Sequence, residues 1–496
     1  MRGTIATGLG AVQLTESTPA DLLQHVTGLV QRGMRLDSLV GVPGSAGVEL
    51  LYVFSFGHTK VVHRVMVPRE DLTVPSLVPL LPECDWPERR IRDLMGVRPV
   101  GHPRAARLVR HAHWPKGFYP LTHDPAVPIG EWGSSAPMQL VRVRGEGIHE
   151  IPVGPIHAGI IEPGHFRFSA DGERIVGLEP RLFYVHRGME WLARGRTPRE
   201  VLSLAEVVSG DSAIGHGWAF CEAIEAIAGI EPPVQAQLLR AALLETERIT
   251  AHITDLGGML NDIAVPAANT RFLGLREDIL RANAACFGHR FLRGVLVPGG
   301  VNAPVGFLGK WAEAVVTAGE LAEAHAKMWL NRAAVVERLE RTGTLQNEVA
   351  QRYRAVGLAA RASGVAHDAR SWSSCPAYSD HEVITQRWGD VMARFLIRVR
   401  EIEASVRLLT SLASEMGPGV TTLPRTDGDG LGSVEGWRGE CLHFVRVEAG
   451  RVVAWVPQDP SAHNWRLLSL AATEDVIPDF PVVNKSFDLS YAGNDL

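Results

Sequence analysis

The chain has 496 residues, of which 46% are hydrophobic and 21% are charged, a composition typical of well-buried globular proteins and not of disordered ones. This length exceeds what one ordinary core accommodates, so two or three domains are expected. The net charge of −5, from 50 basic and 55 acidic residues, leaves no electrostatic basis for binding nucleic acid.

The sequence predicts no membrane-spanning helix, because no run of about 18 apolar residues occurs. The N-terminus lacks a basic segment followed by an apolar one, so no secretory signal is expected. The five cysteines are scattered, and none forms a Cys-x-x-Cys pair. They predict a reduced, cytosolic protein without a disulfide framework and without an iron–sulfur cluster of its own.

Residues 1–123 are predicted to form a small α+β domain. Segments 50–56 and 61–67 are strand-like, and the Gly-His-Thr-Lys stretch between them predicts a hairpin loop. Residues 87–97, Pro-Glu-Arg-Arg-Ile-Arg-Asp-Leu-Met-Gly-Val, predict a short charged helix that ends at its glycine.

His111 and His113 follow in a stretch rich in turn-forming residues. A metal site is one interpretation of this pair, and solvated or partner-facing histidines are the favoured one. Residues 124–137 contain three prolines, two glycines and two serines, which indicates a linker before a second domain at 138–496.

The second domain is predicted to begin with a small antiparallel sheet. Segment 165–176 alternates around an Asp-Gly dipeptide, which predicts a hairpin. Residues 198–416 are predicted to be mainly helical, starting at the capping-box pattern Thr-Pro-Arg-Glu at 197–200.

Long segments with an apolar stripe at helical spacing predict a helix bundle: residues 233–260, 307–341 and 380–416. A Gly-Pro-Gly stretch at 417–419 is expected to end it. Beyond it, residues 441–447 and 451–456 predict a β-hairpin, and residues 464–472 predict a short helix.

Several motifs in this order carry a resemblance to a known family: Gly154-Pro-Ile-His157, Glu162-Pro-Gly-His-Phe-Arg167, Tyr184-Val-His-Arg-Gly-Met-Glu190, Glu206-Val-Val-Ser-Gly-Asp-Ser-Ala-Ile-Gly-His216 and Asp488-Leu-Ser-Tyr-Ala-Gly-Asn-Asp495. With them the chain resembles the large subunit of group 4 membrane-bound NiFe hydrogenases, of the hydrogenase-3 and hydrogenase-4 type. That family is closely related to the D subunit of NADH-quinone oxidoreductase, respiratory complex I. The N-terminal domain resembles the C subunit of the same complex, with its Glu-Arg-x-x-x-Asp-Leu-x-Gly helix.

The resemblance implies an α+β fold with three parts. A domain like the C subunit of complex I occupies residues 1–123, a linker residues 124–137, and a domain like the D subunit or the hydrogenase large subunit residues 138–496. The last part is expected to combine a small antiparallel sheet, a long-helix bundle and a C-terminal β/α segment whose tail returns to the bundle.

The nickel ligands of the family are missing. In the hydrogenases, Cys-Gly-x-Cys and Asp-Pro-Cys-x-x-Cys frame the metals, and four thiolates hold them. The matching positions here are Ser209, Ser212, Ser490 and Gly493. Because hydroxyls and a glycine cannot replace soft thiolates, we expect no metal site and no nickel-dependent hydrogen turnover. An active nickel enzyme with unusual ligands is a remote alternative.

Quinone chemistry is implied only in part. The D subunit of complex I lines its quinone pocket with a histidine and a tyrosine, and has a further histidine near the terminal cluster. His165 matches the first histidine, but Gly210 falls on the tyrosine and Met259 on the second histidine. Both departures weaken the transfer of that chemistry to this chain.

The resemblance implies that a set of polar residues faces one cavity: Glu162, His165, Ser209, Asp211, Ser212, His216 and Asp488. Carboxylates and histidines in a partly dry cleft can relay protons, so Glu162, His165, Asp211 and His216 are the candidate catalytic residues. A hydrogen-bonded seam between domains is an equally open interpretation.

Other motif residues are implied to lie near a partner. Arg187 and His186, in a His-Arg-Gly-x-Glu motif with Glu190, correspond to residues near the iron–sulfur cluster of the neighbouring subunit, although a structural salt bridge is open for Arg187. Arg248 and His252 match a bundle-helix pattern of the family.

The implied function is that of the peripheral-arm large subunit of a membrane-bound oxidoreductase complex without a NiFe centre. It would pass electrons from an iron–sulfur subunit to a quinone or other acceptor, coupled to ion translocation, at the cytoplasmic face of the bacterial inner membrane. The implied partners are an iron–sulfur subunit like the B subunit of complex I, a membrane subunit like its H subunit, antiporter-like membrane subunits and a ferredoxin-like subunit.

The chain itself would hold no cofactor, with quinone as the one candidate ligand. No dinucleotide fingerprint follows a strand, so the sequence gives no sign of an NADH site. The alternative function is a non-catalytic scaffold that fastens a peripheral arm to a proton-translocating or transport module in the membrane.

Overall fold

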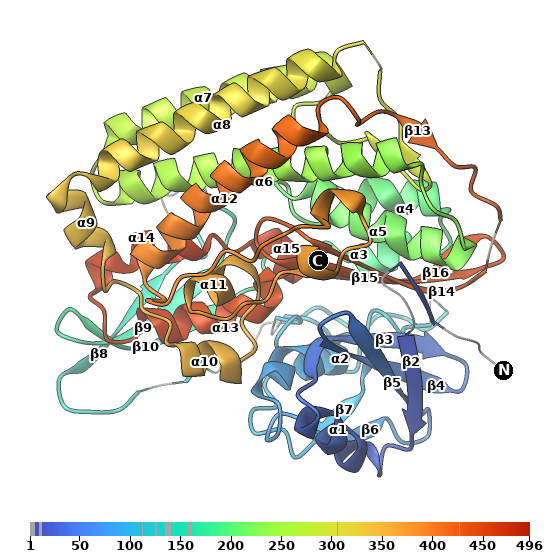
Figure 1. Ribbon diagram of the computed structural model, residues 1–496. Helices are drawn as coiled ribbons and strands as arrows, with labels where there is room; N and C mark the ends of the chain where they lie inside the picture. The colour runs from blue at the N-terminus through green and yellow to red at the C-terminus, as the bar shows by residue number, and fades with distance from the viewer. Residues whose placement is uncertain are drawn as a thin grey trace.

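The computed structural model describes residues 5–8, 12–111, 113–124, 126–133, 140–141, 143–156, 161–304, 306–425 and 427–496. Figure 1 shows a smaller α/β part, in blue, beside a larger part in which long helices form one layer. His157, in the first family motif, and residues 125 and 134–137 of the predicted linker lie outside the described residues.

A four-stranded sheet organises the smaller part. β2 (Val12–Ser17), β3 (Arg35–Gly44), β4 (Gly47–Phe56) and β5 (Thr59–Pro68) lie in the order β2-β5-β4-β3, with β2 parallel to β5 and the other pairs antiparallel. The β4–β5 hairpin confirms the turn predicted there. Helix α1 (Leu22–Gln31) buries its apolar side in the core.

Helix α2 (Asp85–Met95) is the predicted charged helix, and it ends at Gly96, which adopts a left-handed conformation with φ 82°. Several charged residues of α2 are buried, because they bond to the loop that follows. A two-stranded parallel sheet of β6 (Thr73–Pro75) and β7 (Arg98–Val100) flanks it. Pro82–Cys84 forms a short 3-10 turn before it.

A three-stranded antiparallel sheet begins the larger part. β8 (Ile148–Val153), β9 (His165–Asp171) and β10 (Arg174–Arg181) lie in the order β10-β9-β8. The β9–β10 hairpin turns at 172–173, which confirms the prediction made from the Asp-Gly dipeptide.

The bundle consists of long helices joined by turns: α5 (Ala213–Ala228), α6 (Val234–Asp262), α7 (Pro266–Phe287), α8 (Leu308–Leu330) and α12 (Val391–Leu412). Shorter helices surround them: α3 (Met189–Ala193), α4 (Pro198–Ala205), α9 (Ala333–Leu339), α10 (Asn347–Arg352) and α11 (Gly357–Ala362), with 3-10 turns at Ala369–Trp372 and Pro376–Tyr378. The predicted capping box is present, since the Thr197 side chain and Glu200 bond to each other's main-chain N–H groups.

Two predicted long helical segments differ from the observed helices. Segment 307–341 is divided into α8 and α9, which separate at Asn331 and Arg332. Segment 380–416 becomes helical only at Val391, because the Asp390 side chain caps the Ala393 N–H and residues 380–390 form irregular structure.

A second four-stranded sheet lies beneath α5. β14 (Gly428–Glu435), β15 (Glu440–Glu448) and β16 (Arg451–Gln458) are antiparallel, and β1 (Ile5–Thr7) from the start of the chain adds to β14 in parallel. The sequence predicted only β15 and β16. Helix α5 approaches β14 so closely that a Cβ at Gly432 would lie 1.9 Å from the Ala219 carbonyl oxygen, so this contact requires glycine.

Three short strands, β11 (Leu296–Val297), β12 (Gly300–Val301) and β13 (Gly419–Val420), form a small sheet at the end of the bundle. The chain then closes with α13 (Ser461–Ala472), a 3-10 turn at Ile477–Asp479, α14 (Phe480–Phe487) and α15 (Tyr491–Asp495). α13 corresponds to the predicted short helix.

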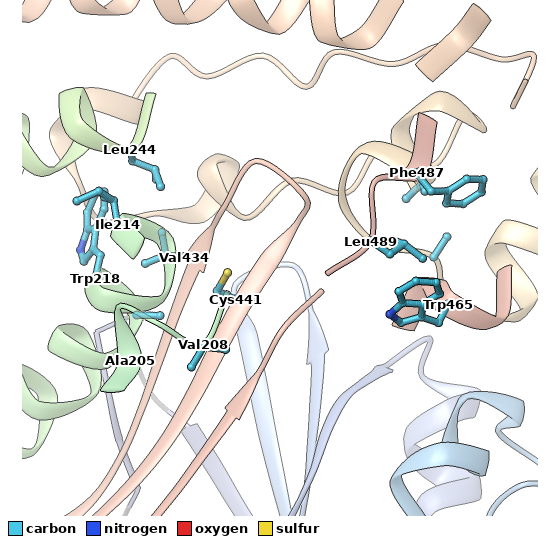
Figure 2. Close-up of a cluster of buried hydrophobic side chains, with 14 of the residues drawn as sticks. Ala205, Val208, Ile214, Trp218, Leu244, Val434, Cys441, Trp465, Phe487 and Leu489 are labelled. Carbon is cyan, nitrogen blue, oxygen red and sulfur yellow. The ribbon is translucent and has the colours of Figure 1, made fainter. Parts of the chain in front are cut away.

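The main core is continuous from the smaller part to the tail. Figure 2 shows a portion of it, with Ile214 and Trp218 on one side of the β14–β15 hairpin and Trp465 and Phe487 on the other. The turn of this hairpin, residues 436–439, therefore reaches the place where the start of α5 meets the tail.

Candidate functional site

The two framing motifs meet, as expected from the resemblance. The Ser209 Oγ lies 2.8 Å from the Ser490 Oγ, although the two residues are 281 positions apart. The Ser490 hydroxyl also caps α15 by accepting a hydrogen bond of 2.9 Å from the Gly493 N–H. The tail is thus fastened to the loop that precedes α5, and both serines are buried.

A buried arginine occupies the centre of this frame. Arg438, in the turn between β14 and β15, donates from Nη1 to Asp211 Oδ1 at 2.6 Å and from Nη2 to Asp211 Oδ2 at 2.8 Å. Its Nη1 also lies 3.3 Å from the Ser209 Oγ and 3.4 Å from the Ser212 Oγ. Figure 2 shows the hairpin that carries this turn between the two groups of core side chains.

The same guanidinium contacts the tail. Its Nε donates to the Asp488 carbonyl oxygen at 2.5 Å, and its Nη2 lies 3.3 Å from Asp488 Oδ2. The Trp437 ring lies 3.8 Å beneath it. Burial alone would lower the pKa of Arg438, but Asp211 and Asp488 raise it above its ordinary value, so the side chain stays charged.

The residues present do not fit a nickel–iron centre. A permanent cation fills the frame, and the hydroxyls of Ser209 and Ser490 bond to each other. A Cβ at Gly493 would lie 2.5 Å from the Asp459 Cγ, so even a restored cysteine has no room there. Within the described part of the chain, no group of three or more His, Cys, Asp or Glu side chains could hold a metal ion.

The ion pairs continue from Asp488 into the bundle. Lys485 Nζ lies 2.9 Å from Asp488 Oδ1 and 3.2 Å from Asp255 Oδ1. Arg398 binds the other oxygen of Asp255 at 2.7 Å. Burial and then the Asp488 charge raise the pKa of Asp255 to about 6, while Lys485 and Arg438 overcome burial and lower the pKa of Asp488.

A small cavity of about 100 Å³ adjoins this network, with Gly210, Asp211, Asp255, Trp437 and Asp488 among its lining residues. Pockets for drug-sized ligands span about 300–1,000 Å³, so this cavity suits a few water molecules and not a quinone ring. Gly210, where the family's phenol would stand, thus faces a space too small for that ligand.

Glu247 also lines the cavity, although no sequence motif singled it out. Its carboxylate accepts hydrogen bonds from the Ile214 N–H at 2.7 Å and the Gly215 N–H at 3.0 Å, at the start of α5. Burial raises its pKa to about 8 even so. This carboxyl group therefore takes up and releases a proton near neutral pH.

Glu162 and His165 lie on the tail side of the frame. Glu162 Oε2 accepts a hydrogen bond of 2.8 Å from the Ala492 N–H. The His165 Nδ1 donates to the Gly154 carbonyl oxygen at 3.0 Å, and the side chain is almost wholly buried, with 7% of the residue exposed. Its Nε2 has no hydrogen-bond partner among the described residues.

Contrary to expectation, the seven polar residues do not face one cavity: only Asp211 and Asp488 line the cavity of about 100 Å³, whereas Glu162, His165, Ser209, Ser212 and His216 do not. His216 points away from the frame. It is fully buried, with Nδ1 2.9 Å from His443 Nε2 and Nε2 2.9 Å from Asp459 Oδ2. Since the Trp455 N–H points to His443 Nδ1, a consistent chain of donors runs from Trp455 through both histidines to Asp459. Its position one turn into α5 directs His216 toward the sheet, and its role there is to hold Asp459 beside Gly493.

Arg187 and His186 also fasten the tail. Arg187 donates to the carbonyl oxygens of Val207 at 2.6 Å, Val208 at 2.8 Å and Ala492 at 2.8 Å. His186 Nδ1 donates to the Asp495 carbonyl oxygen at 2.7 Å. All three of these arginine contacts are to main-chain carbonyls, so the guanidinium organises both framing segments.

The remaining motif residues are structural. Glu190 pairs with Arg90 at 3.1 Å and so links α3 to α2. His252 Nε2 lies 2.8 Å from Glu401 Oε2, and Arg248 Nη1 lies 3.6 Å from the same carboxylate. Met259 is buried in the core.

Four central residues are marked by no sequence motif: Arg438, Asp459, Glu247 and Lys485. Arg438 lies in the turn between β14 and β15, and Asp459 directly follows β16. Both are far along the chain from Ser209, and no local pattern marks them. A charged residue in the tight turn Gly-Trp-Arg-Gly at 436–439 is ordinary in a solvent-exposed hairpin, so only the tertiary structure reveals its burial.

Comparisons with known proteins agree with this arrangement. The family model described as the 30 Kd subunit of respiratory-chain NADH dehydrogenase matches residues 15–128, and the model described as its 49 Kd subunit matches residues 262–426. Hydrogenase-4 component G of Escherichia coli is 30% identical in an alignment of 447 positions that covers 88% of this chain and 78% of that protein.

Two further similarities extend over most of the chain. The C/D subunit of NADH-quinone oxidoreductase from Phocaeicola vulgatus is 27% identical, over 85% of this chain and 88% of that protein. One chain of the membrane-bound sulfane sulfur reductase, described as an archaeal respiratory membrane complex, superposes with a TM-score of 0.64 at 25% identity. The match covers 71% of this chain and 99% of that one.

None of the helices in the described part of the chain is long and apolar enough to cross a membrane. The relatives are nevertheless named as parts of hydrogenase and NADH-quinone oxidoreductase complexes. At 30% identity over most of a curated relative, and with a 30 Kd-type region preceding a 49 Kd-type region, the chain belongs to the family of group 4 hydrogenase-like and complex I-like large subunits.

Proposed function

We propose that this chain is the large peripheral subunit of a membrane-bound respiratory complex that works without a nickel–iron centre. In this proposal, electrons from an iron–sulfur partner subunit reach a quinone or other acceptor, and their flow is coupled to ion translocation. The relatives named as hydrogenase and NADH-quinone oxidoreductase subunits support the assignment to such a complex. The cation in the metal frame supports the absence of nickel chemistry.

The proposed acceptor site rests on His165 Nε2, which has no hydrogen-bond partner among the described residues. A buried polar atom without a partner costs about 1–3 kcal/mol, so a retained one indicates a ligand. Because Nδ1 donates to the Gly154 carbonyl, Nε2 of the neutral ring accepts a hydrogen bond, as from a hydroquinone hydroxyl. After taking up a proton, the same atom donates instead.

Carboxyl groups that line the small cavity would supply or receive the protons that accompany reduction. The pKa of Asp255 is raised to about 6 and that of Glu247 to about 8, so both change protonation near neutral pH. Asp211 is held in a bidentate pair with Arg438 and would position the cavity wall. Glu162 would hold Ala492, and hence the tail, beside His165.

The proposed partners follow from the resemblance. An iron–sulfur subunit like the B subunit of complex I would lie beside His186 and Arg187. Membrane subunits like the H subunit and the antiporter-like subunits would anchor the complex at the cytoplasmic face of the inner membrane, with a ferredoxin-like subunit as a candidate donor.

The test is His165→Ala in the complex purified through this chain. We expect loss of at least 90% of quinone reductase turnover while the same subunits co-purify, because the proposed contact to the acceptor is gone. His325→Ala, in α8 and outside the frame, is the control and should keep full turnover. Unchanged turnover of the His165 variant would reject the acceptor site.

A scaffold function is favoured by a different observation. The polar groups of the frame bind one another, since Arg438 is held between Asp211 and Asp488. The adjoining cavity, of about 100 Å³, is too small for a quinone. Elemental analysis of the detergent-purified complex separates the two functions. Iron without nickel supports electron transfer, neither metal with membrane subunits still attached supports the scaffold, and stoichiometric nickel contradicts both.

A further inference from the structure

A second and larger cavity, of about 1,120 Å³, lies away from the metal frame. Its walls come from α2, from the loop at 103–116, from strands β9 and β10 and from α13. The cavity thus lies between the smaller part of the molecule and the three-stranded sheet of the larger part. None of the candidate site residues other than His111 and His113 lines it.

The cavity is strongly basic. Eight of its lining residues are arginine or lysine, and two are acidic. Five of these cations have acidic partners among the described residues: Arg89 and Arg466 with Asp85, Arg104 with Glu179, Arg110 with Asp93, and Arg167 with Glu150. The surplus of positive charge therefore comes from the cations that have no acidic partner among the described residues.

Arg107 and Arg181 form no ion pair with any described residue. Arg107 Nη1 points to the main-chain oxygens of His111 at 3.5 Å and Trp114 at 3.3 Å. Arg181 Nη1 donates to the Arg107 carbonyl oxygen at 3.1 Å. Arg181 is 92% buried, since 8% is exposed, and its Nε has no hydrogen-bond partner in the described structure.

The electrostatic consequences appear in neighbouring groups. Burial and the charge of Arg89 lower the pKa of Arg181. Burial and the charge of Arg181 lower the pKa of His111 to about 4, so this histidine is neutral at physiological pH and donates to the Leu182 carbonyl. A negative charge in the cavity would relieve the repulsion between the guanidinium groups.

Exposed apolar side chains lie among these cations. Val141 is 55% exposed and Leu470 is 39% exposed, and both line the cavity. The ring of Trp114, also on its wall, lies 5.2 Å from that of Trp132 between centroids. The surface therefore offers apolar contacts next to unneutralised positive charge.

We propose that this cavity binds an acidic segment of another subunit of the complex, with carboxylates on Arg107 and Arg181 and apolar side chains against Val141 and Leu470. A polypeptide suits the site better than a small anion, because the volume of about 1,120 Å³ exceeds the range of about 300–1,000 Å³ for small-molecule pockets. Charge complementarity of this kind selects the partner and orients it. The proposal depends on membership in a multisubunit family and not on the proposed electron acceptor.

Site-specific crosslinking in the assembled complex tests the occupant. A photoreactive benzoylphenylalanine in place of Val141 should crosslink to another subunit, and mass spectrometry should identify a segment with a net negative charge. The same residue at Leu273, exposed on α7, is the positional control and should not capture that segment. Crosslinks only within this chain, or to a neutral or basic segment, would overturn the proposal.

Binding to the purified full-length chain tests the chemistry. A fluorescein-labelled peptide of alternating glutamate and leucine should bind with an affinity that falls as salt rises, and its glutamine counterpart should bind at least tenfold more weakly. Arg107→Ala and Arg181→Gln should each weaken binding about fivefold or more, whereas Arg281→Ala on α7 should leave it unchanged. Equal binding of both peptides, or displacement of the acidic peptide by millimolar inorganic phosphate, would reject a polypeptide ligand.

Discussion

The arginines of the metal frame and those of the large cavity differ in the groups that oppose their charge. Arg438 is enclosed by the carboxylates of Asp211 and Asp488, and its pKa is raised. Arg181 is equally buried but points to a main-chain oxygen, and its pKa is lowered. Both are about nine-tenths buried, so burial does not distinguish them.

This difference indicates that the charge of Arg438 stabilises the fold and that the charge of Arg181 is available to bind a ligand. A charge that is matched by carboxylates within the chain closes a site, as Arg438 closes the frame that holds metals in the hydrogenases. A buried positive charge without a carboxylate partner in the chain can be stabilised by a carboxylate of a partner subunit. Substitutions at the two sites should therefore differ sharply in their effect on stability.

The largest effect is expected for Arg438→Met. Removal of this cation leaves the partly buried Asp488 beside Asp211, whose side chain is 48% exposed. The free energy of unfolding should fall by about 2–3 kcal/mol, less than the about 3–5 kcal/mol typical of a fully buried pair, because water reaches Asp211. Urea unfolding of the purified chain measures this. Adding Asp211→Asn to the variant should restore part of the loss, whereas a loss below about 1 kcal/mol would show that the pair is not structural.

The second expected effect is on the pH dependence of stability and concerns Glu247. Its folded pKa of about 8 exceeds the ordinary value of 4.5, so the folded chain binds more protons than the unfolded chain between these values. Its contribution to stability is complete below pH 4.5 and is lost as pH rises through 8.

Within this window, Glu247 should make stability fall with a limiting slope of about 1.4 kcal/mol per pH unit. Glu247→Gln should remove this component, so the variant should lose less stability than the natural chain between about pH 5.5 and about pH 7.5, values chosen inside the window. Urea midpoints at both pH values measure the difference. Parallel pH profiles would show that Glu247 is already ionised in the folded state.

A matched pair of glycines tests whether the frame is sterically closed. Gly493→Ala places a methyl group 2.5 Å from the Asp459 Cγ and should destabilise the chain by about 1–3 kcal/mol. Gly274→Ala, in the exposed face of α7 with no atom within 4 Å, should instead stabilise it slightly through better helix propensity. Equal effects of the two changes on stability would mean that position 493 has room for a side chain, including a metal-binding cysteine.

Local sequence signals predicted the elements that depend on neighbouring residues. The hairpin at 172–173, the capping box before α4 and the end of α2 at Gly96 each follow from turn or cap chemistry. The pairing of β1 with β14 could not be predicted in this way. Ile5 and its partner Asp429 are far apart in the sequence, and a strand of three residues is too short to show an alternation of polar and apolar side chains.

The candidate site could be predicted from sequence only as far as the family motifs reach. They correctly brought Ser209 to Ser490, yet they gave no sign that Arg438 fills the space between the motifs. They also placed His216 on the wrong side of its helix, because the helical position of a single histidine is compatible with either a cavity or a core. Tertiary contacts decide both questions.

The smallest effect, and the sharpest contrast with Arg438, is expected for Arg181→Met. Replacing a buried, unmatched cation with an apolar side chain of similar length removes the repulsion from Arg89 and loses one hydrogen bond to the Arg107 carbonyl. The net change in the free energy of unfolding should be within about 1 kcal/mol, or stabilising. Urea unfolding of the chain without partners measures it, and a loss comparable to that of Arg438→Met would show that Arg181 is structural. Retained stability together with weakened binding of the acidic peptide would instead mean that the charge of Arg181 serves the partner, since only the bound state then depends on it.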